Sequence, residues 1–112
     1  MDLSSNKFTE FPLCVKDAPK LKVLRLIYNQ IRTIPTEYYK AENVKENLEE
    51  LNMNSNPLIE LHSSIKMVSK LKVLGISYTK IKEIPRTIID LEHLKQISCY
   101  GTPLKEPKST IA

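Results

Sequence analysis

The sequence predicts an α/β solenoid, a curved stack of short repeats with a parallel β-sheet on its concave face. Three observations support this fold class. Apolar residues recur in the same order along most of the chain, the later copies are 23 residues apart, and each copy opens with apolar residues that alternate with polar ones. A single short repeat cannot bury its own apolar side chains, so neighbouring copies must stack and share one core.

The repeats can be located from their first leucine. They start at Leu21, Leu48, Leu71 and Leu94, at spacings of 27, 23 and 23 residues, and a partial copy occupies residues 1–20. Two copies align over fifteen positions: LKVLRLIYNQIRTIP from Leu21 to Pro35, and LKVLGISYTKIKEIP from Leu71 to Pro85. We therefore expect one repeat domain over residues 1–112.

This pattern, L-x-x-L-x-L-x-x-N-x-L, resembles the leucine-rich repeat superfamily over nearly the whole chain. The 23-residue period with Ile-Pro is similar to the class that includes Ras-suppressor-type proteins, and similar short repeats occur in bacterial host-interacting proteins. The resemblance implies a curved solenoid that binds another protein, without implying Ras as the partner. We expect no cofactor.

The first half of each repeat should form a short strand whose alternate side chains point into the core. The expected core pairs are Leu24 and Leu26, Leu51 and Met53, Leu74 and Ile76, and Ile97 and Cys99. Equivalent strands of successive repeats should pair in parallel.

The strand is followed by a turn whose side chain can bond backbone groups that would otherwise be buried without partners. By resemblance, this structural ladder consists of Asn6, Asn29, Asn56, Thr79 and Thr102. A threonine has only one hydroxyl for the task, so the C-terminal turns should be less tightly bonded.

The return along the convex side should begin at Pro12, Pro35 and Pro85, where proline fixes φ. The segment after Pro35 is four residues longer than its equivalents, and its apolar spacing predicts a short helix over roughly residues 37–46. A 3-10 turn or an extended return is expected in the other repeats.

Both ends look uncapped, because Met1 falls in mid-repeat and the sequence stops soon after Leu104. Solenoids need polar capping units, since bare ends invite pairing with another chain. Three explanations stay open: the chain is a fragment of a longer protein, it forms homo-oligomers through its ends, or its end residues are adequate caps.

Outward strand residues should form rows across the concave face, where a protein partner would bind. The candidate contacts are Arg25, Tyr28, Asn52, Asn54, Val73, Ser77, Tyr78 and Tyr100. Aromatic and arginine side chains dominate binding hot spots, so Tyr28, Tyr78, Tyr100 and Arg25 are the expected anchors. The alternative is that the tyrosines pack against the following turn and bind nothing.

Other functions find little support in the sequence. The net charge of +4 is spread along the chain rather than gathered in a basic block, which argues against nucleic acid. Lys72, Lys80, Lys82 and Arg86 form a local basic patch that favours a solvated rim over an anion site. His62 and His93 do not make a zinc site. Catalytic motifs are absent, so we expect no enzyme and no metal.

The location of the protein is left undecided by the sequence. No signal peptide is visible, and no apolar run approaches the roughly 18 residues of a membrane helix. Two widely separated cysteines, Cys14 and Cys99, favour a reducing compartment such as the cytoplasm, while secretion or surface display stays open. The expected function is protein binding through the concave face; the alternative is self-association, as a structural or host-interacting surface protein, through the uncapped ends.

Overall fold

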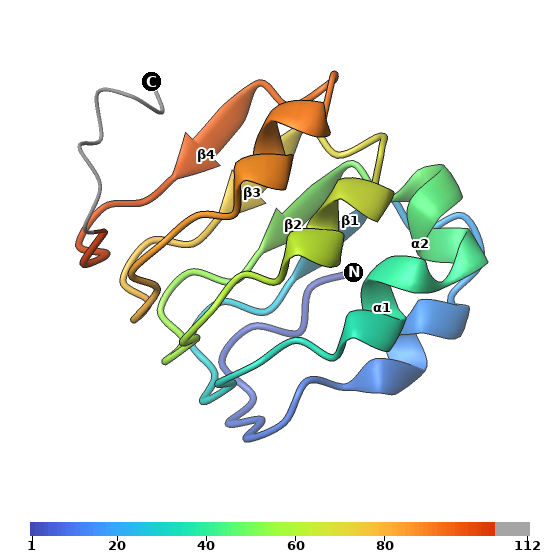
Figure 1. Ribbon diagram of the computed structural model, residues 1–112. Coiled ribbons are helices and arrows are strands. Elements are labelled where there is room, and N and C mark those ends of the chain that lie inside the picture. Colours follow the sequence, from blue (N-terminus) through green and yellow to red (C-terminus); the bar gives the residue numbers. More distant parts are fainter. Residues whose placement is uncertain (105–112) are drawn as a thin grey trace.

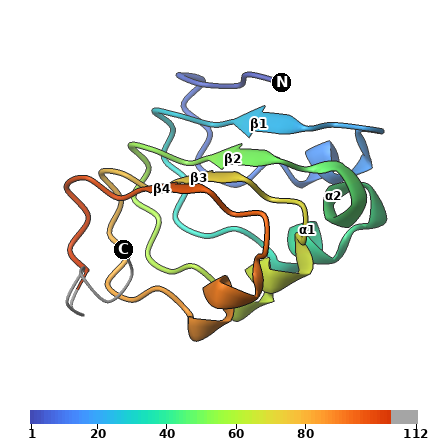
Figure 2. The same cartoon turned by 90° about the horizontal axis from the view of Figure 1, so that it is seen from above.

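Four short strands lie side by side in one parallel sheet, in chain order, in the computed structural model, which describes residues 1–104 (Figure 1). The strands are β1 (Val23–Arg25), β2 (Glu50–Asn52), β3 (Val73–Gly75) and β4 (Gln96–Ser98). Helical turns line the opposite side of the chain, so each repeat makes one circuit of a solenoid (Figure 2). The predicted fold class is confirmed.

The strands pair at equivalent positions of successive repeats. Leu24 is in register with Leu51, Leu51 with Leu74, and Leu74 with Ile97. The partial first copy extends the sheet by one bridge, between Asp2 and Arg25. Because the register never slips, every outward position forms a straight row across the concave face.

The convex side carries a 3-10 turn in the partial first copy and in the repeats that start at Leu48 and Leu71. The repeat that starts at Leu21 carries two short α-helices instead. The 3-10 turns are η1 (Leu13–Asp17), η2 (Ser63–Met67) and η3 (Arg86–Asp90), and the helices are α1 (Thr36–Lys40) and α2 (Glu42–Asn47). The short convex turns expected outside the long repeat are therefore present.

The prediction of one helix over residues 37–46 is wrong, because the chain breaks at Ala41. This residue is extended, with ψ of 137°, and its N–H donates to Tyr38 O at the end of α1. Tyr38, Tyr39 and Val44 are all buried. In one continuous helix of 3.6 residues per turn these three side chains would spread around the whole circumference, so the break allows all of them to reach the core.

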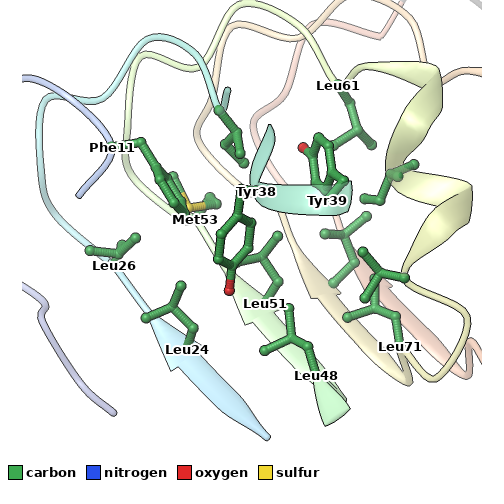
Figure 3. Close-up of a cluster of buried hydrophobic side chains, with 14 of the residues drawn as sticks. Phe11, Leu24, Leu26, Tyr38, Tyr39, Leu48, Leu51, Met53, Leu61 and Leu71 are labelled. Atoms are coloured by element: carbon green, nitrogen blue, oxygen red, sulfur yellow. The ribbon is translucent and has the colours of Figure 1, made fainter. Parts of the chain in front are cut away.

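The core lies between the sheet and the convex turns. Leu24, Leu51 and Leu74 are completely or almost completely buried, and the aromatic side chains of α1 lie beneath the strands (Figure 3). The Tyr38 ring packs on Phe11, with the ring centroids 4.7 Å apart. The four additional residues of this repeat therefore supply aromatic bulk to the N-terminal half of the core.

Two of the predicted core residues are less buried than expected. Ile97 and Cys99 are only partly buried, although they pack against the core. Ile97 lies in β4 and Cys99 directly follows this strand, and no further strand of residues 1–104 covers them. The expected lack of a capping element after Leu104 concerns residues that lie outside the described part of the chain.

Tyr38 has the only buried side-chain nitrogen or oxygen without a hydrogen-bond partner in residues 1–104, its hydroxyl. We expect Tyr38→Phe to raise the free energy of unfolding by about 1 kcal/mol, because leaving a buried polar group unpaired costs about 1–3 kcal/mol. Equilibrium urea denaturation measures this. Tyr39→Phe is the matched control and should change stability little. A stability loss in Tyr38→Phe larger than in the control would show that the hydroxyl has a partner.

Alkaline pH should destabilise the protein through the same two rings. Burial raises the pKa of both Tyr38 and Tyr39 above the usual value near 10. The unfolded chain therefore loses these protons first, and the stability present below about pH 10 falls as the pH rises above it. Urea midpoints measured between neutral and strongly alkaline pH should fall, and less steeply in Tyr38→Phe. Parallel curves for the two proteins would contradict this account.

Candidate functional site

The concave face is made of rows of outward side chains that cross the four strands. One row consists of Asp2, Arg25, Asn52, Gly75 and Ser98, and the row before it of Val23, Glu50, Val73 and Gln96. Beyond the strands follow the row Ser4, Ile27, Asn54, Ser77 and Tyr100 and the row Ser5, Tyr28, Ser55, Tyr78 and Gly101. Backbone hydrogen bonds from Tyr28 to Asn54 (3.1 Å) and from Tyr78 to Tyr100 (2.7 Å) continue the alignment past the strand ends.

The turn ladder behind this face rests on Asn29 and Asn56, both buried. Asn56 Oδ1 accepts from the Ile31 N–H at 3.1 Å, and its Nδ2 donates to three carbonyls, of which Leu26 O is nearest at 2.7 Å. Asn29 makes five such bonds to backbone groups. These amides join neighbouring repeats directly and hold the strand ends in place.

The other predicted ladder residues make fewer bonds. Asn6 is exposed, and its Nδ2 bonds only Leu3 O and Ser4 O within its own turn. The hydroxyls of Thr79 and Thr102 each make one bond, and both donate to Ile76 O, at 2.8 and 2.7 Å.

A second polar ladder, which the sequence analysis missed, lies on the concave side. Asn52 Oδ1 accepts from the Asn54 N–H at 3.1 Å, and Asn54 Oδ1 accepts from the Ser77 N–H at 2.8 Å. Ser77 Oγ in turn accepts from the Tyr100 N–H at 3.0 Å. Ser77 is predicted to contact a partner, yet it is only 3% exposed. It therefore supports the face from below.

The three predicted tyrosine anchors project from the face. Tyr28 is 69% exposed, Tyr78 65% and Tyr100 76%. Most of each side chain therefore faces solvent. A Cβ placed on Gly101 would lie 2.6 Å from Tyr78 Cδ1, so the Tyr78 ring lies over this glycine.

The row Ser5, Tyr28, Ser55, Tyr78 and Gly101 adopts left-handed backbone throughout, with φ between 57° and 67°. Glycine accepts this conformation freely, whereas a bulky side chain at positive φ is an outlier. Two tyrosines nevertheless occupy the row. In the sequence, only Gly101 hints that this row has positive φ, because tyrosine has no preference for this conformation.

Arg25, the fourth predicted anchor, forms an ion pair. Its Nε donates to Glu50 Oε2 at 2.9 Å, diagonally across β1 and β2. The hydrogen bond that Arg25 donates to Glu50 and the charge of the Glu50 carboxylate raise the pKa of Arg25 above its usual value. Next to it, hydrogen bonds from Ser4 lower the pKa of Asp2. Arg25 is therefore held against the sheet.

Residues 1–104 contain no group of three histidine, cysteine or acidic side chains that lie close enough together to bind one metal ion. His62 instead caps η2, since its Nδ1 accepts from the Ser64 N–H at 3.1 Å. A shallow cleft lies between residues 59–61 and 82–85, away from the strands. Within the same residues, no helix is both long and apolar enough to span a membrane.

Comparison with known proteins agrees with this geometry. The leucine-rich repeat family model matches residues 47–67. A leucine-rich repeat protein of Leptospira interrogans superposes on 99% of this chain with 28% identity and a TM-score of 0.86, and the match covers 27% of that protein. The PEPR1–AtPEP1 crystal structure matches 90% of this chain with 31% identity and a TM-score of 0.74, over 14% of its own chain.

The BIR3–SERK2 complex from Arabidopsis thaliana contains a chain that matches 95% of this one at 24% identity, with a TM-score of 0.82 over 57% of its length. This chain thus spans roughly a quarter of the Leptospira protein and between about a seventh and three fifths of the other two. No curated protein sequence matches it significantly.

Proposed function

Since this chain is a leucine-rich repeat protein, we propose that it is a binding module which holds a protein partner on the concave face of β1–β4. The observation that carries the proposal is the exposure of Tyr28, Tyr78 and Tyr100 above a rigid polar sheet. Tyrosine brings a large apolar area and a hydroxyl to an interface while few of its bonds must be frozen.

The residues around the tyrosines suit the same purpose. Asn52, Asn54, Ser55 and Gly101 are small or adaptable, and together with the tyrosines they reproduce the Tyr, Ser, Gly and Asn composition of antibody binding loops. The concave hydrogen-bond ladder fixes the backbone beneath them. Such preorganisation lowers the entropy cost of binding.

The strained backbone points the same way. A non-glycine residue in the left-handed region costs about 1–3 kcal/mol. Tyr28 and Tyr78 adopt this conformation without burying their rings, so their packing does not offset the cost. The two side chains contribute little to the folded core, and contact with a partner would explain why tyrosine occupies these positions.

The solved relatives add general support. The PEPR1–AtPEP1 and BIR3–SERK2 structures are complexes, and leucine-rich repeats serve commonly as protein-interaction scaffolds. The exposed rows of this chain would serve a partner in the same way. The identity of that partner is not implied by the likeness.

The test is capture from a native extract with wild-type protein and the variant Tyr78→Ser/Tyr100→Ser, followed by affinity measurement with the recovered partner. We expect the affinity to fall roughly 30-fold or more, because one hot-spot side chain contributes about 2 kcal/mol. The control variant is Ile59→Ser/Ile89→Ser, which removes two large exposed side chains outside the sheet. It should bind as the wild type does.

Equal binding by wild type and a folded tyrosine variant would overturn the concave-face proposal. Size-exclusion chromatography of the purified chain then distinguishes the alternative, because self-association through the ends would survive the tyrosine substitutions. Met1, 49% exposed, and the partly buried Ile97 are the apolar residues at those ends that such an association would cover.

A further inference from the structure

Beside the Glu50 carboxylate, the amides of Asn52 and Asn54 present hydrogen-bond donors rather than acceptors to the concave face. The Oδ1 atoms of Asn52 and Asn54 both accept from backbone N–H groups, which fixes how the two amides are turned. Both oxygens also lie over Gly75, where a Cβ would be 2.5 Å and 2.9 Å from them. Within residues 1–104 only the Oδ1 atoms of these two amides bond the protein, so both Nδ2 groups are open to water or to a ligand.

Arg25 extends this set of donors. It is in register with Asn52, and its Nε is engaged by Glu50. Its two terminal nitrogens have no partner within the described residues, and its side chain is 46% exposed. We call Arg25, Asn52 and Asn54 the donor strip. In Asn52 and Asn54 the amide oxygen is bonded to the backbone, and in Arg25 the Nε is paired with Glu50. The other side-chain N–H groups of these residues make no hydrogen bond within the described residues.

A row of three lysines and one glutamate, which we call the lysine row, borders the strands where they begin. Lys22, Glu49, Lys72 and Lys95 are joined in that order by backbone hydrogen bonds of 2.7–2.8 Å. Glu49 pairs with Lys72 at 3.3 Å, whereas Lys22 and Lys95 form no ion pair within residues 1–104. This lysine row lies about 10 Å from the donor strip, since three residues separate them along a strand.

We propose that the concave face recognises an acidic polypeptide segment of its partner, with acceptor groups on the donor strip and carboxylates against the lysine row. The inference rests on the proposed function and specifies the chemistry of the partner. Donors without internal partners are available to acceptors in a ligand, and two unpaired lysines favour negative charge nearby. Carboxylates on a peptide supply both acceptors and negative charge.

Nucleic acid fits the same surface less well. A phosphate backbone carries a charge at every nucleotide, whereas here Glu49 and Glu50 interrupt the positive charge between Lys22 and Lys72. A peptide can place uncharged residues opposite these two glutamates, and a continuous row of phosphates cannot. The surface therefore favours a polypeptide with spaced carboxylates.

The test measures binding of a short poly-glutamate peptide at low salt by fluorescence anisotropy, with a poly-glutamine peptide of equal length as the neutral comparison. We expect poly-glutamate to bind and poly-glutamine not to. The variant Lys22→Glu/Lys95→Glu should weaken binding roughly tenfold or more, because reversed charges repel the probe. The matched control, Lys40→Glu/Lys66→Glu, changes the net charge equally at exposed helix and turn positions on the convex side and should change affinity less than about twofold.

A second variant tests the donor strip. Asn52→Asp/Asn54→Asp keeps the two oxygens that bond the backbone and replaces both donors with acceptors, so binding should be lost while the fold is retained. Equal weakening by the convex control, or no effect of either concave variant, would overturn the inference. So would equal or tighter binding of a single-stranded oligonucleotide or of phosphatidylserine vesicles.

Failure here is distinguishable from failure of the proposed function. If the tyrosine variant loses its natural partner while Lys22→Glu/Lys95→Glu keeps it, the concave face binds a partner that is not acidic. If neither variant affects the partner, the concave face itself is the wrong surface.

Discussion

Replacing Asn56 with alanine should lower the free energy of unfolding by about 3 kcal/mol, since buried partners left unpaired cost about 1–3 kcal/mol each. The substitution leaves the Ile31 N–H and the Met53 carbonyl without the amide that bonds them, whereas the Leu26 carbonyl keeps its bond from the Asn29 amide. Asn56 is 1% exposed, so water cannot easily replace it. Equilibrium urea denaturation followed by circular dichroism gives the value.

Thr102→Val is the matched comparison, because it removes one buried hydroxyl from the equivalent turn two repeats later while keeping the shape of the side chain. Its single bond, to Ile76 O, predicts a loss of about 1 kcal/mol. If Asn56→Ala proved no more destabilising than Thr102→Val, the amide would not be the joint between repeats that its bonds indicate.

The second large effect is expected at the centre of the sheet. Leu74→Ala should cost about 3–4 kcal/mol, because the side chain is fully buried between β2 and β4 and its removal leaves a cavity. Ile97 occupies the same position in β4, where it is only partly buried. Ile97→Ala should therefore cost clearly less, about 1–2 kcal/mol.

Both variants can be measured by the same denaturation experiment. Equal losses at Leu74 and Ile97 would mean that something covers β4 in solution as completely as β4 covers β3. A second molecule at the end of the sheet would do this, and the difference between the two losses should then depend on protein concentration.

Much of the fold could be predicted because the repeat imposes it. The alternation from Leu71 to Ile76 fixes which side chains point inward, and equal repeat lengths fix the register. The prediction of one helix in the long repeat was wrong, because apolar spacing alone does not indicate the break at Ala41. Burial of Ile97 and Cys99 was overestimated because a core position needs a neighbour on each side.

The candidate site was less predictable than the fold. The rows of outward residues follow from the register, and the exposed tyrosines stand where the pattern placed them. The repeat pattern does not indicate that Ser77 is buried, that Arg25 pairs with Glu50, or that Asn52 and Asn54 turn their oxygens inward. Apart from the bond between Asn52 and Asn54, these features depend on contacts between repeats, which no pattern within one repeat encodes.

Each repeat contacts only its neighbours, and this determines how the molecule unfolds locally. When contacts are restricted to adjacent units, local unfolding proceeds from the ends, and amide hydrogen exchange is graded rather than uniform. The N–H groups of Gln96 and Tyr100 should exchange sooner than those bonded at β2. A ligand that reaches from Tyr28 to Tyr100 would link these independently opening units, so its arrival would slow exchange most at β4, the strand with least support of its own.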